Sequence, residues 1–91
     1  MNNTANLSIG QFVISKAGRD KGKIFIVIEV VDDLFVNVAD GSLRKLEKPK
    51  KKKIKHLQQM NTISNDISDK ISEGKKITNL MLRKEIEKLG L

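Results

Sequence analysis

Four basic side chains fall within one short turn that also contains Gly18 and Gly22: Lys16, Arg19, Lys21 and Lys23. Head groups carried by one turn can converge on neighbouring phosphates, and backbone N–H groups beside the glycines can add anion contacts. Arg19 is the best candidate for a bidentate or stacking contact, because its guanidinium is planar. The spacing therefore predicts a phosphate-binding loop, and the alternative is a solvated hairpin loop.

A second basic element follows between residues 44 and 55. It contains Arg44, Lys45, Lys48, Lys50, Lys51, Lys52, Lys53 and Lys55. Like charges placed this close together repel one another unless a polyanion neutralises them. We therefore expect these side chains to bind the same kind of polyanion, with a mobile charged loop as the alternative.

The charge of the whole chain supports this interpretation. The 91 residues carry 18 basic and 11 acidic side chains, for a net charge of +7. Up to Gln58 there are 12 basic and 6 acidic residues, whereas the remainder has 6 and 5. An excess confined to one half of a chain is expected where that half meets a nucleic acid. The alternative to nucleic-acid binding is a surface charge that only keeps the protein soluble.

The composition argues against several classes of protein. The chain has no cysteine and a single histidine, His56, which we interpret as a surface or packing residue. Most zinc sites and the usual catalytic triads are therefore excluded, and we expect no cofactor, no metal and no enzymatic activity. No apolar run approaches the length of a membrane helix, and the first ten residues do not resemble a signal peptide. We expect a cytoplasmic protein without a membrane partner.

Short, apolar, β-branched runs must position the first basic turn. They predict strands over Gly10–Ser15, Lys23–Val31 and Phe35–Ala39. The second run is long for a strand, so we expect it to bend. Its period of two predicts a core face, which Ile24, Ile26, Ile28 and Val30 form. In and beside the third run, Leu34, Val36 and Val38 fall on one face and Asn37 on the other.

The region after the third strand is predicted to close an antiparallel barrel. Asp40-Gly41 is a two-residue hairpin signal, so Ser42–Glu47 is predicted as a fourth strand that Pro49 ends. A short closing strand is predicted over Ile54–Leu57. Short strands at this spacing favour a barrel, because closure removes exposed edges. Three turn glycines are predicted to be structural: Gly18, Gly22 and Gly41.

The hydrophobic period changes after Gln59. Apolar residues at spacings of three and four predict a helix over Ile63–Glu73, with Ser64 or Thr62 as its cap. Thr78 is the predicted cap of a second helix over 79–89. Their apolar stripes form either core or a docking surface. We divide the chain into a flexible N-terminus (1–9), a barrel (10–58) and a two-helix extension (59–91).

Three segments of the sequence resemble a known family: SKAGRDKGK, ADG followed by LRKL, and KKKKIKHL. Over Phe12–Ala39 the chain resembles the KOW motif, whose key glycine matches Gly22. Over Gly10–Leu57 it is similar to the KOW-containing family that includes the large-subunit ribosomal protein of the L-fourteen type and its short bacterial relatives. The resemblance implies an SH3-like barrel that binds RNA, commonly ribosomal RNA. The predicted fold is thus mainly β with a helical appendage.

The aromatic residues limit the mode of binding. The chain has three Phe, no Trp and no Tyr, so stacking of single strands on an aromatic platform is disfavoured. Contacts through phosphates and shape remain, and they suit folded RNA. We therefore expect a monomer that binds structured RNA on the ribosome. The alternative is a protein-interaction module of the transcription or translation machinery.

Overall fold

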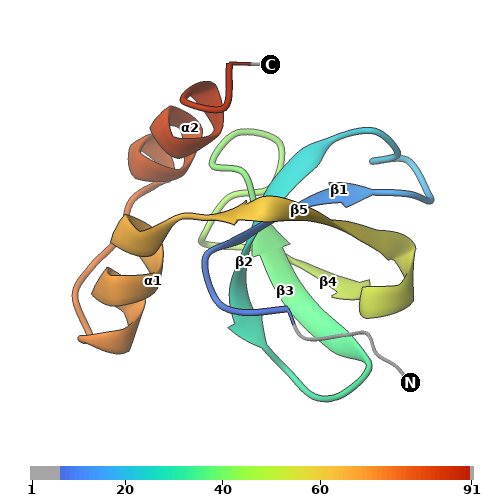
Figure 1. The fold of residues 1–91 in the computed structure, drawn as a ribbon, viewed down its shortest axis with the longest axis horizontal. Coiled ribbons are helices and arrows are strands. Elements are labelled where there is room, and N and C mark those ends of the chain that lie inside the picture. The colour runs from blue at the N-terminus through green and yellow to red at the C-terminus, as the bar shows by residue number, and fades with distance from the viewer. Residues whose placement is uncertain (1–6, 91) are drawn as a thin grey trace.

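The computed structural model describes residues 7–90 as a five-stranded antiparallel sheet followed by two helices (Figure 1). The strands are β1 (Gln11–Ser15), β2 (Ile24–Val30), β3 (Phe35–Ala39), β4 (Lys50–Lys53) and β5 (Leu57–Ile63). Their order in the sheet is β4-β3-β2-β1-β5, and the 3₁₀ turn η1 (Ile54–His56) joins the two edge strands. The mainly β class with two C-terminal helices is confirmed, and the curved sheet is consistent with a small barrel.

The sheet separates two hydrophobic clusters, and β2 contributes to both. Phe25 and Val27 point into an inner cluster together with Val13, Val36, Val38 and Leu57. Ile26 points to the opposite face, where Phe12 and Ala39 lie with it. Both faces are buried because the helices cover the second one. The predicted core face of β2 is therefore only half of the core, and Val30 at its end is 44% exposed.

Helices α1 (Asn65–Ser72) and α2 (Asn79–Glu87) lie beside each other on one side of the sheet (Figure 1). Ile67 of α1 and Leu82 of α2 are fully buried in the second cluster. The predicted caps are confirmed, because the Ser64 and Thr78 hydroxyls accept from the backbone N–H groups of Ile67 and Met81. These apolar stripes are thus core rather than a free docking surface.

Three predictions about the middle of the chain are wrong. Residues 42–47 form an irregular loop and no strand, because the Asp40 carboxylate accepts from the N–H groups of Ser42 and Arg44 and closes a local turn. The lysine run, for which no strand is predicted, is β4 and pairs with β3. The predicted strand over Ile54–Leu57 is η1 and the first residue of β5.

Other boundaries differ less. The first three predicted strands correspond to β1, β2 and β3, and a register shift between Val27 and Glu29 marks the expected irregularity in the long strand. β5 crosses the domain boundary predicted at Gln58 and continues to Ile63. Most of the predicted flexible segment 1–9 lies outside the described residues, but Leu7 packs against the inner cluster. Among residues 7–90, neither helix is long and apolar enough to span a membrane.

Candidate nucleic-acid interface

The β1–β2 loop (residues 16–23) carries the first predicted set of basic residues. Its ends are held together, because Gly22 N–H donates to the Ser15 carbonyl (2.8 Å) and Ser15 N–H donates to the Lys23 carbonyl (2.9 Å). Within the loop, Lys23 N–H donates to the Asp20 carbonyl at 2.9 Å. The side chains of all four predicted basic residues are exposed: Lys16, Arg19, Lys21 and Lys23. A folded loop of this kind holds its charges at defined positions.

The one acid of this loop, Asp20, turns inward and is only 3% exposed. The Arg44 guanidinium donates to Asp20 Oδ2 from Nε (3.2 Å) and Nη2 (3.0 Å). Lys52 Nζ lies 3.6 Å from the same oxygen and donates to Ser15 Oγ at 3.2 Å. We call Ser15, Asp20, Arg44 and Lys52 the charge cluster. It joins the β1–β2 loop, the β3–β4 loop (residues 40–49) and strand β4.

The charge cluster determines the ionisation of Asp20. Burial by itself raises the pKa of this carboxyl, but hydrogen bonds and positive charges from Arg44 and Lys52 outweigh burial and lower the pKa below its usual value. The carboxylate is therefore ionised at neutral pH. Its negative charge compensates two cations that would otherwise repel each other.

The charge cluster changes the interpretation of two predicted phosphate contacts. Lys52 occupies an inward-facing position of β4, opposite buried Val36, and is only 9% exposed. Its ammonium group faces Ser15 and Asp20 and not the surface. The Arg44 side chain is 31% exposed, but its guanidinium is engaged by Asp20. Sequence reasoning grouped these two residues with the surface cations because no local signal shows that both pair with the distant Asp20.

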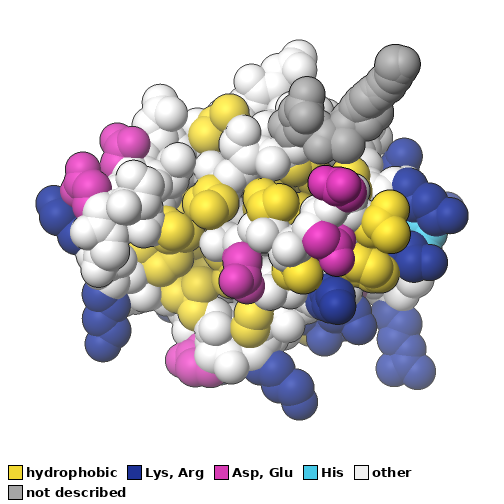
Figure 2. Space-filling view, turned by 90° about the horizontal axis from the view of Figure 1, so that it is seen from below, with side chains coloured by type: hydrophobic (Ala, Val, Ile, Leu, Met, Phe, Trp, Pro, Cys, Tyr) yellow, Lys and Arg dark blue, Asp and Glu magenta, His cyan; other side chains and the backbone are white. Residues whose placement is uncertain are grey.

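The other predicted contacts lie on the surface. Lys50, Lys51 and Lys53 on β4 are exposed, and Lys51 Nζ lies 4.7 Å from the centroid of the Phe35 ring. The remaining three are exposed on the β3–β4 loop and η1: Lys45, Lys48 and Lys55. Figure 2 shows Lys and Arg side chains gathered around the single histidine at one edge of the molecule. His56 itself is half-buried, and its carbonyl accepts from Lys16 N–H at 2.8 Å.

Helix α2 fixes the β3–β4 loop from the other side. Asn79 Oδ1 accepts from Leu46 N–H (2.9 Å), and Asn79 Nδ2 donates to Glu47 Oε1 (2.9 Å). Arg83 Nη1 donates to the Gly41 carbonyl at 2.6 Å. Sequence reasoning missed these contacts, since no local signal connects residues more than 30 positions apart. The C-terminal helices therefore help to position one of the two basic elements.

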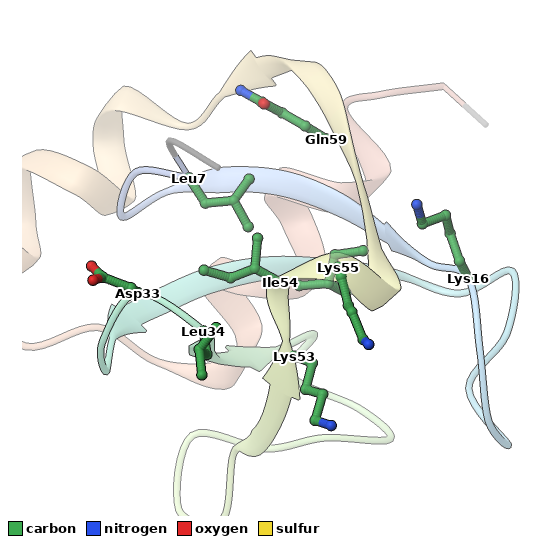
Figure 3. Close-up of a pocket in the computed structure, with 9 residues that line it drawn as sticks. Leu7, Lys16, Asp33, Leu34, Lys53, Ile54, Lys55 and Gln59 are labelled. Carbon is green, nitrogen blue, oxygen red and sulfur yellow. The ribbon is translucent and has the colours of Figure 1, made fainter. Parts of the chain in front are cut away.

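A hollow lies beside the basic residues, between η1, β5 and the β2–β3 turn (Figure 3). Its volume is about 650 Å³. Four aliphatic side chains line its floor: Leu7, Leu34, Ile54 and Leu57. Three lysines, a glutamine and an aspartate complete the lining: Lys16, Lys53, Lys55, Gln59 and Asp33. We call it the lysine-rimmed hollow.

Fold and charge together define a class of small basic proteins in which a barrel-like sheet presents cationic loops. A relative from Bacillus subtilis (strain 168), named "Putative ribosome-binding protein YbzG", is 31% identical over 71 residues. The match covers 78% of this chain and 96% of the relative. The chain therefore belongs to the same family as that protein. No protein-family model matches the chain, so its resemblance to the KOW motif stays a prediction.

Proposed function

We propose that this protein binds structured RNA on the ribosome through a KOW-type basic surface and that it catalyses no reaction. The observation that carries the proposal is the exposure of ten predicted basic side chains, nine of them on the three elements that the charge cluster joins and Lys55 on η1. The printed name of the Bacillus subtilis relative supports the ribosome as the location. A monomer in the cytoplasm, in contact with ribosomal RNA, is part of this proposal.

The physical basis is the neutralisation of phosphates. Each phosphate that pairs with a lysine or an arginine releases condensed counterions, so binding weakens as salt is added. The β1–β2 loop supplies a fixed array, because backbone hydrogen bonds and Asp20 hold it. Strand β4 adds Lys50, Lys51 and Lys53 on a second rigid element. Rigid cations suit a folded RNA whose phosphates also have fixed positions.

The salt dependence of binding tests this mechanism. Fluorescence anisotropy with a folded ribosomal RNA fragment should give a log–log slope of affinity against salt near −5 if about six phosphates are neutralised. An affinity that barely changes with salt would rule out phosphate neutralisation as the main source of binding. Sedimentation with ribosomal subunits, with and without ribonuclease, then tests whether the ribosome is the location.

Charge reversal tests which cations contact the RNA. The double variant Arg19→Glu/Lys21→Glu changes two exposed side chains of the β1–β2 loop and should weaken RNA binding without unfolding the sheet. Lys75→Glu/Lys76→Glu is the matched control, because it makes the same change in net charge on the exposed linker between the helices. Equal losses in the two variants would mean that net charge alone drives binding and that the loop has no special role.

A further inference from the structure

The floor of the lysine-rimmed hollow combines residues that pack on the inner cluster with one exposed leucine. Leu7 and Ile54 lie over the inner cluster and face each other across the hollow (Figure 3). Leu34 is 67% exposed although it is a large aliphatic residue. Its neighbour Val31 in the β2–β3 turn is 41% exposed. Concave apolar surfaces rimmed by polar groups commonly mark interaction sites.

The rim of the hollow has a definite charge. Lys16, Lys53 and Lys55 come from three different elements and lie on one side of the aliphatic floor (Figure 3). Asp33 is the one acid of the lining, and its carboxylate points away from Ile54 (Figure 3). A ligand that places an apolar group on the floor therefore lies beside three lysines. Electrostatic complementarity calls for carboxylates or phosphates beside that apolar group.

The chemistry of the floor favours a protein segment over RNA. Proteins hold unstacked bases by stacking them on aromatic rings or on Arg guanidinium planes, and the lining has neither. Branched aliphatic side chains instead suit the packing of another aliphatic or aromatic side chain. A second copy of this chain is disfavoured by the net charge of +7. The six residues that precede Leu7 contain no acidic side chain to match the rim.

We propose that the lysine-rimmed hollow binds an acidic segment of a partner protein. The segment inserts one bulky apolar side chain against Leu34, Ile54 and Leu57, and its flanking carboxylates pair with Lys16, Lys53 and Lys55. This interaction goes beyond RNA binding, although the rim shares Lys16, Lys53 and Lys55 with the proposed RNA-binding surface. The aliphatic floor belongs to the protein site alone, and Arg19 and Lys21 lie outside the hollow.

Short peptides test the proposal directly. The probes are acetyl-Glu-Asp-X-Asp-Glu-amide peptides in which X is Leu, Phe or Ala, titrated into ¹⁵N-labelled full-length protein at low salt. The Leu and Phe peptides should shift the backbone amide signals of Leu34, Ile54 and Gln59. The Ala peptide should bind about tenfold more weakly, because burial of one large apolar side chain accounts for a difference of this order.

A matched pair of variants locates the site. Leu34→Asp places an anion on the floor and should weaken the Leu peptide by about tenfold, through lost apolar contact and repulsion of the peptide carboxylates. Leu43→Asp makes the same change at a leucine that is 53% exposed in the β3–β4 loop, away from the lining, and should leave the affinity unchanged. Because both leucines are exposed, neither substitution should unfold the protein, and circular dichroism verifies this.

Three outcomes would overturn the proposal. Equal affinity for the Leu and Ala peptides would show simple ion exchange, as would shifts confined to the β1–β2 loop. Equal losses in the two leucine variants would place the site elsewhere. A hexameric oligouridine that by itself shifts the Leu34 amide on the floor would assign the hollow to nucleic acid. None of these results bears on the RNA-binding test, which uses Arg19 and Lys21 and a folded RNA.

Discussion

The two loops that carry the predicted phosphate contacts are held in different ways. The β1–β2 loop is held by charge, because its Asp20 carboxylate accepts from Arg44 and lies 3.6 Å from Lys52 Nζ. The β3–β4 loop shares the Arg44–Asp20 pair but is also held by close packing, because Gly41 lies directly against the first turn of α2. The first arrangement depends on ionisation and the second on shape. This difference indicates which changes should affect each loop.

Two glycines show the contrast most directly. Gly22 and Gly41 both have a positive φ, of 86° and 80°, which side chains rarely adopt. A β-carbon at Gly22 would meet no other group within 4 Å. A β-carbon at Gly41 would overlap the backbone carbonyl of Asn79 and press on the Arg83 side chain. One position therefore restricts conformation alone, whereas the other restricts conformation and volume.

The largest expected effect is that of Gly41→Ala. The substitution combines a strained positive φ with an overlap against helix backbone that cannot move without displacing α2. We expect a loss of about 3–5 kcal/mol in the free energy of unfolding, the sum of conformational strain and overpacking. Urea denaturation followed by circular dichroism measures this loss.

Gly74→Ala is the matched control for Gly41→Ala. Gly74 also has a positive φ, and a β-carbon there would meet nothing within 4 Å. The control should lose only the conformational part, about 1–2 kcal/mol. If the two variants are equally stable, the contact between the β3–β4 loop and α2 does not constrain the fold.

The next largest effect is expected from Asp20→Asn, which keeps the shape of the side chain and removes its charge. Lys52 would then remain buried without an anion, and Arg44 would lose its partner. Removing one partner of a buried ion pair costs about 3–5 kcal/mol in the free energy of unfolding. We expect a smaller loss of about 2–3 kcal/mol, because Arg44 can turn to solvent. The matched variant Asp33→Asn removes an exposed acid and should change stability by less than about 0.5 kcal/mol. A comparable loss in both would contradict a structural role for the charge cluster.

The sequence was sufficient to predict the parts of the fold with a local signal. Strands β1, β2 and β3 follow period-two apolar runs, and Ser64 and Thr78 act as caps at the positions their side-chain chemistry indicates. The prediction failed where long-range contacts decide the structure. Four consecutive lysines have no strand signature, yet they form β4 because β3 pairs with them and Asp20 attracts Lys52.

The candidate site shows the same division. The exposed cations of the β1–β2 loop were identified from residue type and spacing alone. The roles of Asp20 and Lys52 could not be identified in this way. Asp20 is buried as a charge only because Arg44 and Lys52 pair with it, and they lie 24 and 32 residues away in the sequence. The amphipathic segment 42–47 was taken for a strand, whereas Asp40 and Asn79 satisfy its backbone groups from outside. The lysine-rimmed hollow also needs residues from separate elements.

A smaller effect is expected from Gly22→Ala. The sequence predicts a structural role for this glycine, but the space around it is open. The cost is then the conformational strain of a positive φ alone, about 1–2 kcal/mol, so the variant should stay folded. Because the β1–β2 loop would shift locally, we expect the free energy of RNA binding to change by more than the free energy of unfolding. Global unfolding of Gly22→Ala would show that the loop conformation is more strongly coupled to the sheet than these contacts indicate.

The smallest expected effect is the dependence of stability on acid pH. The pKa of Asp20 is about 3.8 when unpaired and lies lower in the folded protein, because Arg44 and Lys52 outweigh burial. A carboxyl whose pKa is lowered on folding contributes stability that is complete above its unfolded pKa and disappears as pH falls through the folded value. The wild type should therefore lose stability below about pH 4 more steeply than Asp20→Asn, which has no proton to bind there. Urea denaturation of both proteins between about pH 6 and pH 2 measures the difference, and parallel curves would mean that ionised Asp20 contributes nothing to holding the two loops together.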